Sequence, residues 1–367
     1  MKGEILYYGG FALPDKSASA NRVVANGKLF ESLGYETVFL GSCYDDELSG
    51  MRQISKNMFE EPHAATTAEW IKQVLCFSNL KNVAAECKNL KMVLLYNVPF
   101  ITLFLTKMYF SRGNIVVAYD CTEWTQFTEG SVLKKAFKYI DEFFIRKYAH
   151  KIADKMIVIS KMMEDSYKSD KKVLKLPPLV DVNDAIWHQE TEKETDFNFC
   201  FAGFPGGNKE SLDKVVEAFK SLDNQNTKLK IIGINQVEFS ELYPNIVVSD
   251  NISFLGKKTH KDTIKNILGC DCYIFIRPSD RRNNAGFPTK FVESFTCGVP
   301  IITTDVSDIK EYITLSEDSI LLNNYETEDI QKAMKTVLNK GRNKKASVLK
   351  ADFHYIGYRE KAKLWLE

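Results

Sequence analysis

Residues 277–302 constrain the fold of this chain more than any other stretch, because they predict a loop, a helix, a tight turn and a strand in that order. The apolar residues 272–276 precede them and have the pattern of a buried strand. Gly298 and Pro300 end the expected helix and begin the strand 301–304, since glycine and proline commonly follow a helix C-terminus. Strand, helix and strand in succession are typical of a parallel βαβ unit.

The same alternation runs along the whole chain and predicts an α/β fold with parallel sheets. At 367 residues the chain is long enough for two domains. Pro177 and Pro178 stiffen a linker that becomes polar and acidic over residues 189–196, so we expect the boundary there. The other expected strands are residues 4–8, 37–40, 92–96, 115–119, 155–159, 197–201, 228–232 and 252–255.

The start of the helix within residues 277–302 has the features of an anion site. The first N–H groups of a helix have no partner within it and carry partial positive charge. Gly286 lets a phosphate approach the backbone, and Pro288 is tolerated in a first turn. Lys290 adds a cation, and Glu293 follows one turn later on the same face. This pattern suits a nucleotide-diphosphate sugar, and the alternative is an ordinary βα turn with a solvated Lys–Glu pair.

Residues 277–302 resemble the donor-binding signature of the GT4 family of retaining glycosyltransferases. Gly286 and Phe287 match its Gly-Phe pair, Glu293 matches its second glutamate, and residues 298–302 match its Gly-x-Pro-x-Ile close. Ala285 stands where the family has its first glutamate, which contacts the donor sugar. The run from Arg277 to Lys290 is similar to a subgroup associated with bacterial capsule and other surface polysaccharide synthesis.

The resemblance implies the GT-B fold, two Rossmann-like domains with the active cleft between them. Residues 1–182 would form the acceptor-side domain and residues 183–350 the nucleotide-sugar domain. The tail 351–367 would form a helix that packs back on the first domain. The family also implies retention of the anomeric configuration.

A second phosphate-binding segment is implied where the second domain begins. Residues 201–209 resemble the family's strand followed by G-R-x-x-x-x-K-G, in which Gly203 and Lys209 match and Phe204 replaces the arginine. Arg277, Lys290 or Arg282 would then supply the missing cation. The alternative for Lys209 is a solvated residue at a helix start.

Two further segments follow strands of the first domain, at the edge where α/β sheets present functional groups. Gly9 and Gly10 leave backbone room for a diphosphate or a sugar, and a plain turn is the alternative. Asp120 and Glu123 stand near a motif in which the family carries a histidine or an acidic residue. They would orient the acceptor hydroxyl or stabilise charge at the anomeric carbon, or else Asp120 caps a helix and Glu123 closes a capping box.

The expected helix 133–150 has an amphipathic pattern, with apolar residues at helical spacing. Residues 131–155 carry a net charge of +4. Such a helix fits an anionic membrane surface, and the alternative is a face buried inside the domain. Its apolar positions are Leu133, Phe137, Ile140, Phe144 and Tyr148.

Composition excludes several classes of protein. The net charge of +1 argues against nucleic-acid binding. No apolar run reaches the roughly 20 residues that span a bilayer, and the start of the chain does not have a signal-peptide pattern. The eight cysteines contain no C-x-x-C pair and the histidines no zinc spacing, so we expect reduced core thiols in a cytoplasmic protein. Because no Asp-x-Asp occurs, we expect no metal and no cofactor.

We therefore predict a metal-independent, retaining glycosyltransferase that moves a sugar from a UDP- or GDP-sugar to a glycan or lipid-linked glycan hydroxyl. Two alternatives remain open, a non-catalytic partner subunit and a GT-B nucleotide-sugar 2-epimerase. The predicted catalytic residues are Gly10, Asp120 and Glu123. The predicted donor-binding residues are Gly9, Gly203, Lys209, Arg277, Gly286, Phe287, Pro288, Thr289, Lys290 and Glu293.

Overall fold

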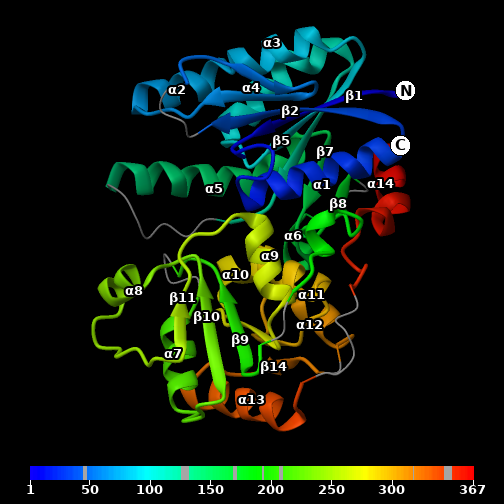
Figure 1. The fold of residues 1–367 in the computed structure, drawn as a ribbon. Helices are drawn as coiled ribbons and strands as arrows, with labels where there is room; N and C mark the ends of the chain where they lie inside the picture. Colours follow the sequence, from blue (N-terminus) through cyan, green and yellow to red (C-terminus); the bar gives the residue numbers. More distant parts are fainter. Residues whose placement is uncertain are drawn as a thin grey trace. The chain divides into compact units, whose positions relative to one another are not determined.

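The computed structural model describes residues 1–43, 48–124, 132–167, 172–191, 194–205, 210–316, 318–342 and 349–367. The chain divides into two compact units (Figure 1). Unit 1 comprises Met1–Val180 together with His354–Glu367, and unit 2 comprises Asp181–Phe353. Each unit is an α/β domain built on its own sheet, as the alternation of strand and helix patterns predicts.

Unit 1 contains a sheet with the strand order β3-β4-β2-β1-β5-β6-β7-β8. Its central strands pair in parallel, and their apolar side chains are buried on both faces because helices cover both. The expectation of purely parallel sheets is wrong at one edge, where β3 and β4 form an antiparallel pair. The strands are β1 Gly3–Gly9, β2 Tyr35–Cys43, β3 Arg52–Ser55, β4 Met58–Pro62, β5 Leu90–Tyr96, β6 Val116–Cys121, β7 Lys155–Val158 and β8 Val173–Lys175.

Helices cover the two faces of this sheet, with α1 and α14 on one face and α2, α3 and α4 on the other (Figure 1). Ser17 caps α1 by accepting a hydrogen bond from the Ala20 N–H, and Gly34 ends it in the left-handed region. The helices of unit 1 are α1 Ala18–Ser32, α2 Thr67–Cys76, α3 Ser78–Glu86, α4 Phe100–Phe110, α5 Val132–Ile152, α6 Lys161–Ser166 and α14 Arg359–Leu366.

The end of the chain belongs to unit 1. Tyr355 donates its N–H to the Val180 carbonyl at 3.0 Å. Trp365 of α14 packs on the ring of Phe30, with 6.3 Å between ring centroids, and its indole N–H donates to the Lys172 carbonyl at 2.8 Å. Burial of the Trp365 ring therefore ties the tail to α1 and to the segment before β8.

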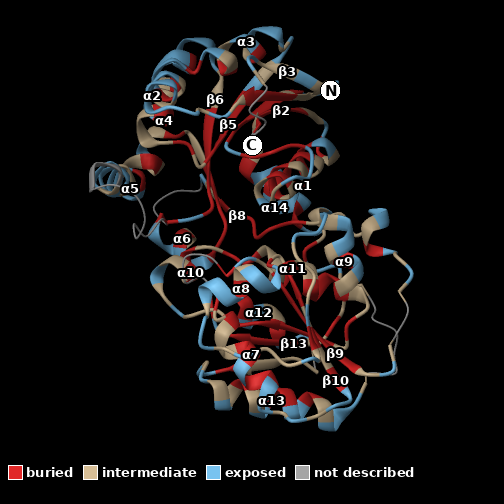
Figure 2. Cartoon of the chain, turned by 60° about the vertical axis from the view of Figure 1, so that its left-hand side comes forward, coloured by how far each residue is buried: buried red, intermediate tan, exposed pale blue. Residues whose placement is uncertain are grey.

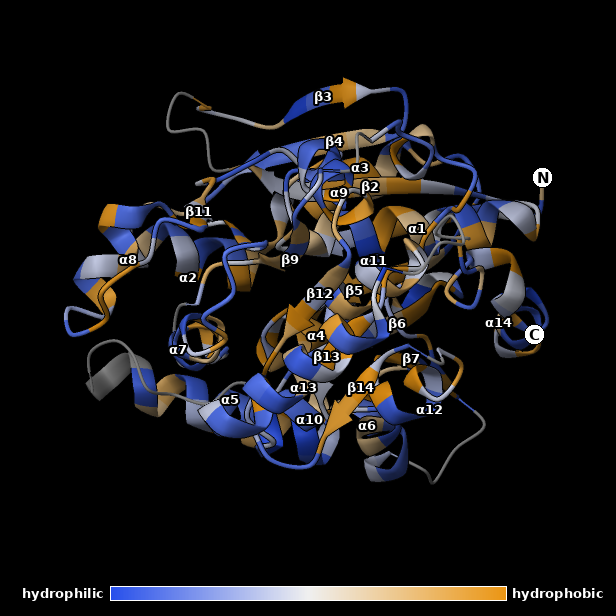
Figure 3. Ribbon diagram, turned by 60° about the horizontal axis from the view of Figure 1, so that its bottom comes forward, coloured by the Kyte–Doolittle hydropathy of each residue, from blue (hydrophilic) through white to orange (hydrophobic). Residues whose placement is uncertain are grey.

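Unit 2 contains a parallel sheet with the strand order β11-β10-β9-β12-β13-β14. The strand interiors are buried in Figure 2 and hydrophobic in Figure 3, as expected for a sheet covered on both faces. The strands are β9 Phe197–Ala202, β10 Thr227–Ile232, β11 Ile252–Phe254, β12 Cys272–Phe275, β13 Ile301–Thr304 and β14 Ile320–Leu322. The helices are α7 Leu212–Lys220, α8 Gln236–Leu242, α9 His260–Leu268, α10 Arg281–Ala285, α11 Thr289–Thr296, α12 Ile309–Ile313 and α13 Thr327–Lys340.

Candidate functional site

The predicted donor segment folds as β12, the short helix α10, helix α11 and β13. Pro288 is the N-cap residue of α11, and its side chain accepts no hydrogen bond from the first N–H groups of the helix. Thr289 and Lys290 are the first two residues of α11. Phe287 is buried, and its ring lies 5.8 Å from the rings of both Tyr312 and Phe353. This aromatic packing fixes the start of α11. The ring of Phe287 thus belongs to the core, which leaves only its backbone for a donor.

A buried carboxylate, Glu210, joins the two predicted cations of this site. Lys290 Nζ lies 2.6 and 2.7 Å from the two Glu210 carboxylate oxygens, and Arg277 Nη2 donates to Oε1 at 3.1 Å. The Glu210 side chain is 2% exposed, whereas that of Lys290 is 23% exposed. The group therefore carries a net charge of +1, and its lysine reaches solvent.

Glu210 was not among the residues predicted from the sequence. It comes directly after Lys209 in the expected phosphate segment, and that lysine lies outside the described residues. The sequence points to Glu210 only indirectly. Two cations that meet in a partly buried place need a counter-ion, and Glu210 supplies it here.

Gly203 has no side chain because Lys290 occupies the space. A Cβ atom at Gly203 would lie 1.6 Å from Lys290 Nζ and 3.0 Å from Glu210 Oε2. The φ angle of Gly203 is +149°, which side-chain-bearing residues rarely adopt. Gly203, Arg277 and Lys290 therefore do meet in the structure, as the sequence-based assignment requires.

We expect Gly203→Ala to displace the Lys290 side chain from Glu210 and to destabilise unit 2 by roughly 1–3 kcal/mol, the usual cost of a side-chain-bearing residue in a sparsely populated backbone conformation. Thermal unfolding measures this loss. Gly10→Ala is the matched control, because no described atom lies within 4 Å of a Cβ built there. Equal melting temperatures for the two variants would contradict the steric role of Gly203.

The carboxylate of Glu293 is hydrogen-bonded to a histidine that the sequence reasoning set aside. Glu293 Oε1 lies 2.9 Å from His260 Nε2, and both side chains are partly exposed. His260 is the first residue of α9, whose N-cap is Thr259. The sequence did not predict this contact. His260 and Glu293 are 33 residues apart in the chain, and no periodic pattern of residues connects them.

Gly286 follows α10 with a φ of −78°, which any residue adopts. Its carbonyl accepts a hydrogen bond from the Ser307 hydroxyl. The conformation alone therefore does not require glycine at position 286.

Arg282 and Arg277 each have a buried Nε atom without a hydrogen-bond partner among the described residues.

The predicted residues of unit 1 lie at the carboxyl ends of β1 and β6. A Cβ atom on Gly9 would lie 2.5 Å from the Tyr96 carbonyl oxygen, so the absence of a side chain there lets β1 and β5 pack closely. Gly10 is exposed, with open space around its Cα among the described atoms. Glu123 is also exposed.

Asp120 is fully buried within β6, where it accepts hydrogen bonds from Arg22 and Tyr7. Arg22 Nη2 and Nε lie 2.9 and 3.3 Å from its two oxygens, and Arg22 Nη1 donates to the Leu176 carbonyl at 3.0 Å. The alternative of a helix N-cap is wrong, because the Asp120 carboxylate points into this network. Since Asp120 has no exposed surface in the structure, its catalytic role stays a prediction.

Burial raises the pKa of the Tyr7 hydroxyl well above its ordinary value, and the charge of Asp120 raises it further. Tyr7 therefore remains a protonated donor to Asp120 at physiological pH. Asn26 in turn donates to the Tyr7 oxygen at 3.2 Å. The network links β1, α1 and β6 below the surface that Gly10 occupies.

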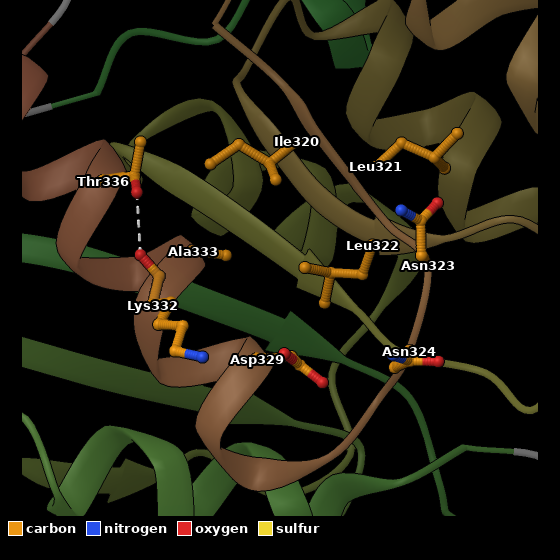
Figure 4. Close-up of a pocket in the computed structure, with 9 residues that line it drawn as sticks. All are labelled: Ile320, Leu321, Leu322, Asn323, Asn324, Asp329, Lys332, Ala333 and Thr336. Atoms are coloured by element: carbon orange, nitrogen blue, oxygen red, sulfur yellow. Dashed lines mark hydrogen bonds between the residues drawn. The ribbon is translucent and has the colours of Figure 1, made fainter.

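A hollow of about 450 Å³ lies elsewhere in unit 2, between β14 and α13 (Figure 4). None of its lining residues belongs to the group around Lys290. It is therefore not the predicted donor site. Its lining consists of Ile320, Leu321, Leu322, Asn323, Asn324, Asp329, Lys332, Ala333 and Thr336.

No group of three or more His, Cys, Asp or Glu side chains arranged to hold a metal ion occurs among the described residues. Within those residues, no helix is long and apolar enough to cross a membrane.

Residues 184–352, which contain the Lys290 group, match the family model of glycosyl transferases group 1. The two α/β units with their parallel sheets define the class of fold, which is a two-domain, GT-B-like fold. The match to the family model falls in the second of these units. Comparison with curated protein sequences gives no match.

Solved structures of GT-B proteins superpose on nearly the whole chain. A glycosyltransferase from Rickettsia africae has a TM-score of 0.68 and 14% identity over 100% of this chain and 96% of its own. Anabaena HepE, in complex with UDP and glucose, has a TM-score of 0.66 and 12% identity, covering 98% of each chain. The UDP-GlcNAc 2-epimerase of Methanocaldococcus jannaschii has a TM-score of 0.61 and 13% identity over 98% of this chain and 99% of its own. At these identities the likeness confirms the predicted GT-B fold, which transferases and epimerases share.

Proposed function

We propose that this protein is a retaining, metal-independent glycosyltransferase that moves a sugar from a UDP- or GDP-sugar to a hydroxyl of a glycan or lipid-linked glycan. The observation that carries the proposal is the pair of cations, Lys290 and Arg277, beside the uncapped start of α11. This group lies inside the segment that matches the group 1 glycosyl transferases. The family resemblance of residues 277–302 supports a role in surface polysaccharide synthesis at the cytoplasmic side of the cell membrane.

In this proposal unit 2 binds the donor. Lys290, Arg277 and the first amides of α11 neutralise the diphosphate, which carries the negative charge that develops as the sugar leaves. Positive charge from side chains takes the place of a divalent metal ion. The carboxylate of Glu293 accepts hydrogen bonds from ribose hydroxyls, and His260 orients it through Oε1.

The transfer step replaces one bond at the anomeric carbon by another. The bond from that carbon to the leaving phosphate oxygen breaks, and a bond to the acceptor oxygen forms on the same face of the sugar. The acceptor proton passes to the departing diphosphate, so charge and atoms balance. Gly10 leaves space for the sugar in unit 1, and the buried pair of Arg22 and Asp120 positions β6 against α1.

Nucleotide release tests this function. The protein is incubated in EDTA with UDP-, GDP-, ADP- and CMP-sugars, with and without membrane lipid extract as acceptor. We expect one nucleotide to be released, only with its matching sugar, and a glycolipid of retained configuration to appear. Release that required an added metal ion would contradict the metal-independent mechanism. Binding of a nucleotide without any release would favour the non-catalytic partner subunit.

A nucleotide-sugar 2-epimerase is the second candidate, and one observation favours it. The structure brings a histidine, His260, to the predicted donor carboxylate Glu293. Such a pair is able to move a proton, as epimerisation at carbon 2 requires. Incubation of the nucleotide sugars in D₂O separates the two functions, because an epimerase would return the sugar nucleotide with deuterium at carbon 2 and would need no acceptor.

A further inference from the structure

Helix α5 contacts α2 and α4 through one side, and near its end Arg146 and His150 also contact Trp124 and Tyr167. Its Asp141 carboxylate accepts a hydrogen bond from the Phe100 N–H at the start of α4, at 2.8 Å. The Phe144 ring stacks on that of Phe100 at 5.3 Å, and the Phe137 ring meets Trp70 of α2 edge-on at 5.1 Å. These contacts define the inner side of α5.

The other side of α5 exposes large apolar side chains. Tyr139, Ile140 and Phe143 are 69%, 54% and 49% exposed. Among the described side chains of the helix, Ile145 and Ala149 are buried, both in its second half. The alternative of a face buried inside the domain is therefore met only in part. Phe137, Phe144 and Tyr148 contact rings of α2 and α4, although Phe137 and Phe144 remain 42% and 38% exposed, whereas Ile140 faces solvent. Figure 2 shows α5 largely in the colour of exposed residues.

Neighbouring helices continue this apolar character. Among the described residues, ten of the nineteen exposed large apolar side chains belong to α2, α4 and α5. Met108 and Tyr109 on α4 are both more than half exposed. An accumulation of this kind on one part of a surface indicates an interaction site, whereas single exposed apolar residues do not.

Cations flank the exposed apolar residues of α5. Lys147 Nζ lies 5.3 Å from the centre of the Phe143 ring, and Lys151 Nζ lies 5.6 Å from that of Tyr148. Long lysine stems that cover aromatic rings while the ammonium groups reach water are typical of side chains at a lipid headgroup layer.

We propose that the exposed side of α5 binds the surface of an anionic lipid bilayer. Tyr139, Ile140 and Phe143 enter the headgroup layer, and the lysines contact lipid phosphates. The 21-residue helix lies in the plane of the membrane. The net positive charge of this side favours anionic lipid over a second copy of the same surface, because like charges repel. The inference deepens the proposed function, since a lipid-linked acceptor would be met at this surface.

Sedimentation with lipid vesicles tests the proposal. The full-length protein is mixed with phosphatidylcholine vesicles that contain or lack phosphatidylglycerol, with no nucleotide present. We expect binding to the anionic vesicles that weakens as salt is added. Ile140→Ser combined with Phe143→Ser should lower the partition coefficient about tenfold or more. Lys147→Glu combined with Lys151→Glu should lower it by a similar factor.

Matched variants in unit 2 serve as controls. Leu242→Ser with Val247→Ser removes two apolar side chains that are 48% and 75% exposed, and Lys332→Glu with Lys335→Glu reverses two exposed charges. Both controls should bind vesicles as the wild type does, and all variants should keep its melting temperature.

Three results would overturn the proposal: a wild type that does not bind anionic vesicles, α5 variants that bind as the controls do, or an α5 variant that dissociates a dimer. The last result would assign the surface to a second copy of the chain. Because the assay contains no nucleotide, its failure is distinct from a failure of the donor site.

Discussion

Lys290→Ala is expected to weaken the stabilisation of this protein by a nucleoside diphosphate. The ammonium group is part of the net positive group formed with Arg277 and Glu210. Its removal leaves Arg277 paired with Glu210, so the net charge of the group falls from +1 to zero. A charge-assisted contact to phosphate contributes about 1.5–3 kcal/mol, so the dissociation constant should rise by one to two powers of ten.

Thermal shift measures this effect, with UDP, GDP, ADP and CMP titrated in EDTA. Glu293→Ala should weaken binding as well, through the ribose, without changing the preference for diphosphate over monophosphate. Lys214→Ala is the control, since this lysine of α7 forms a separate ion pair with Glu326. A Lys290→Ala protein that binds the diphosphate as the wild type does would remove the main support for the donor site.

Arg22→Met should destabilise unit 1 by about 3–5 kcal/mol, the usual cost of leaving one partner of a buried ion pair alone. Arg22 and Asp120 are both fully buried, and their closest nitrogen and oxygen atoms are 2.9 Å apart. The variant leaves the Asp120 carboxylate with Tyr7 as its remaining donor among the contacts described. Urea denaturation followed by tryptophan fluorescence measures the loss as a lower midpoint.

The double variant Arg22→Met with Asp120→Leu should be more stable than Arg22→Met, because it removes the unpaired charge. Lys161→Ala is the surface control, since the exposed pair of Lys161 and Glu164 should contribute less than about 1 kcal/mol. A double variant as unstable as the sum of both single variants would contradict coupling between Arg22 and Asp120. Sugar transfer by the folded double variant then tests whether Asp120 has any role beyond positioning.

The agreement between sequence and structure is best where the signal is local. The strand at residues 301–304 has the predicted bounds, because apolar periodicity and flanking glycine or proline depend on neighbouring residues only. The β3–β4 hairpin was missed, since its short strands carry Glu60 and Glu61, which become buried only through partners such as Arg52 and Tyr8.

The residues of the candidate site also divide into those that a local sequence pattern predicts and those that only the packed structure brings together. Gly203 and Lys290 could be selected from the sequence because they fall in recognisable segments. Glu210 and His260 could not, because each meets its partner across a distance of 33 to 80 residues along the chain. Their contribution depends on the packing of β9, β12, α9 and α11 and not on any local pattern.

The sequence by itself determined the α/β class and the position of the helix start that we propose binds an anion, because both depend on residue order over a few turns. Tertiary structure alone decided that Asp120 is buried with Arg22, that Glu210 holds Lys290, and that Tyr139, Ile140 and Phe143 of α5 face solvent. Burial and charge pairing arise from residues far apart in the chain. An amphipathic pattern states that a helix has two sides, but only the packed structure shows which side the protein covers.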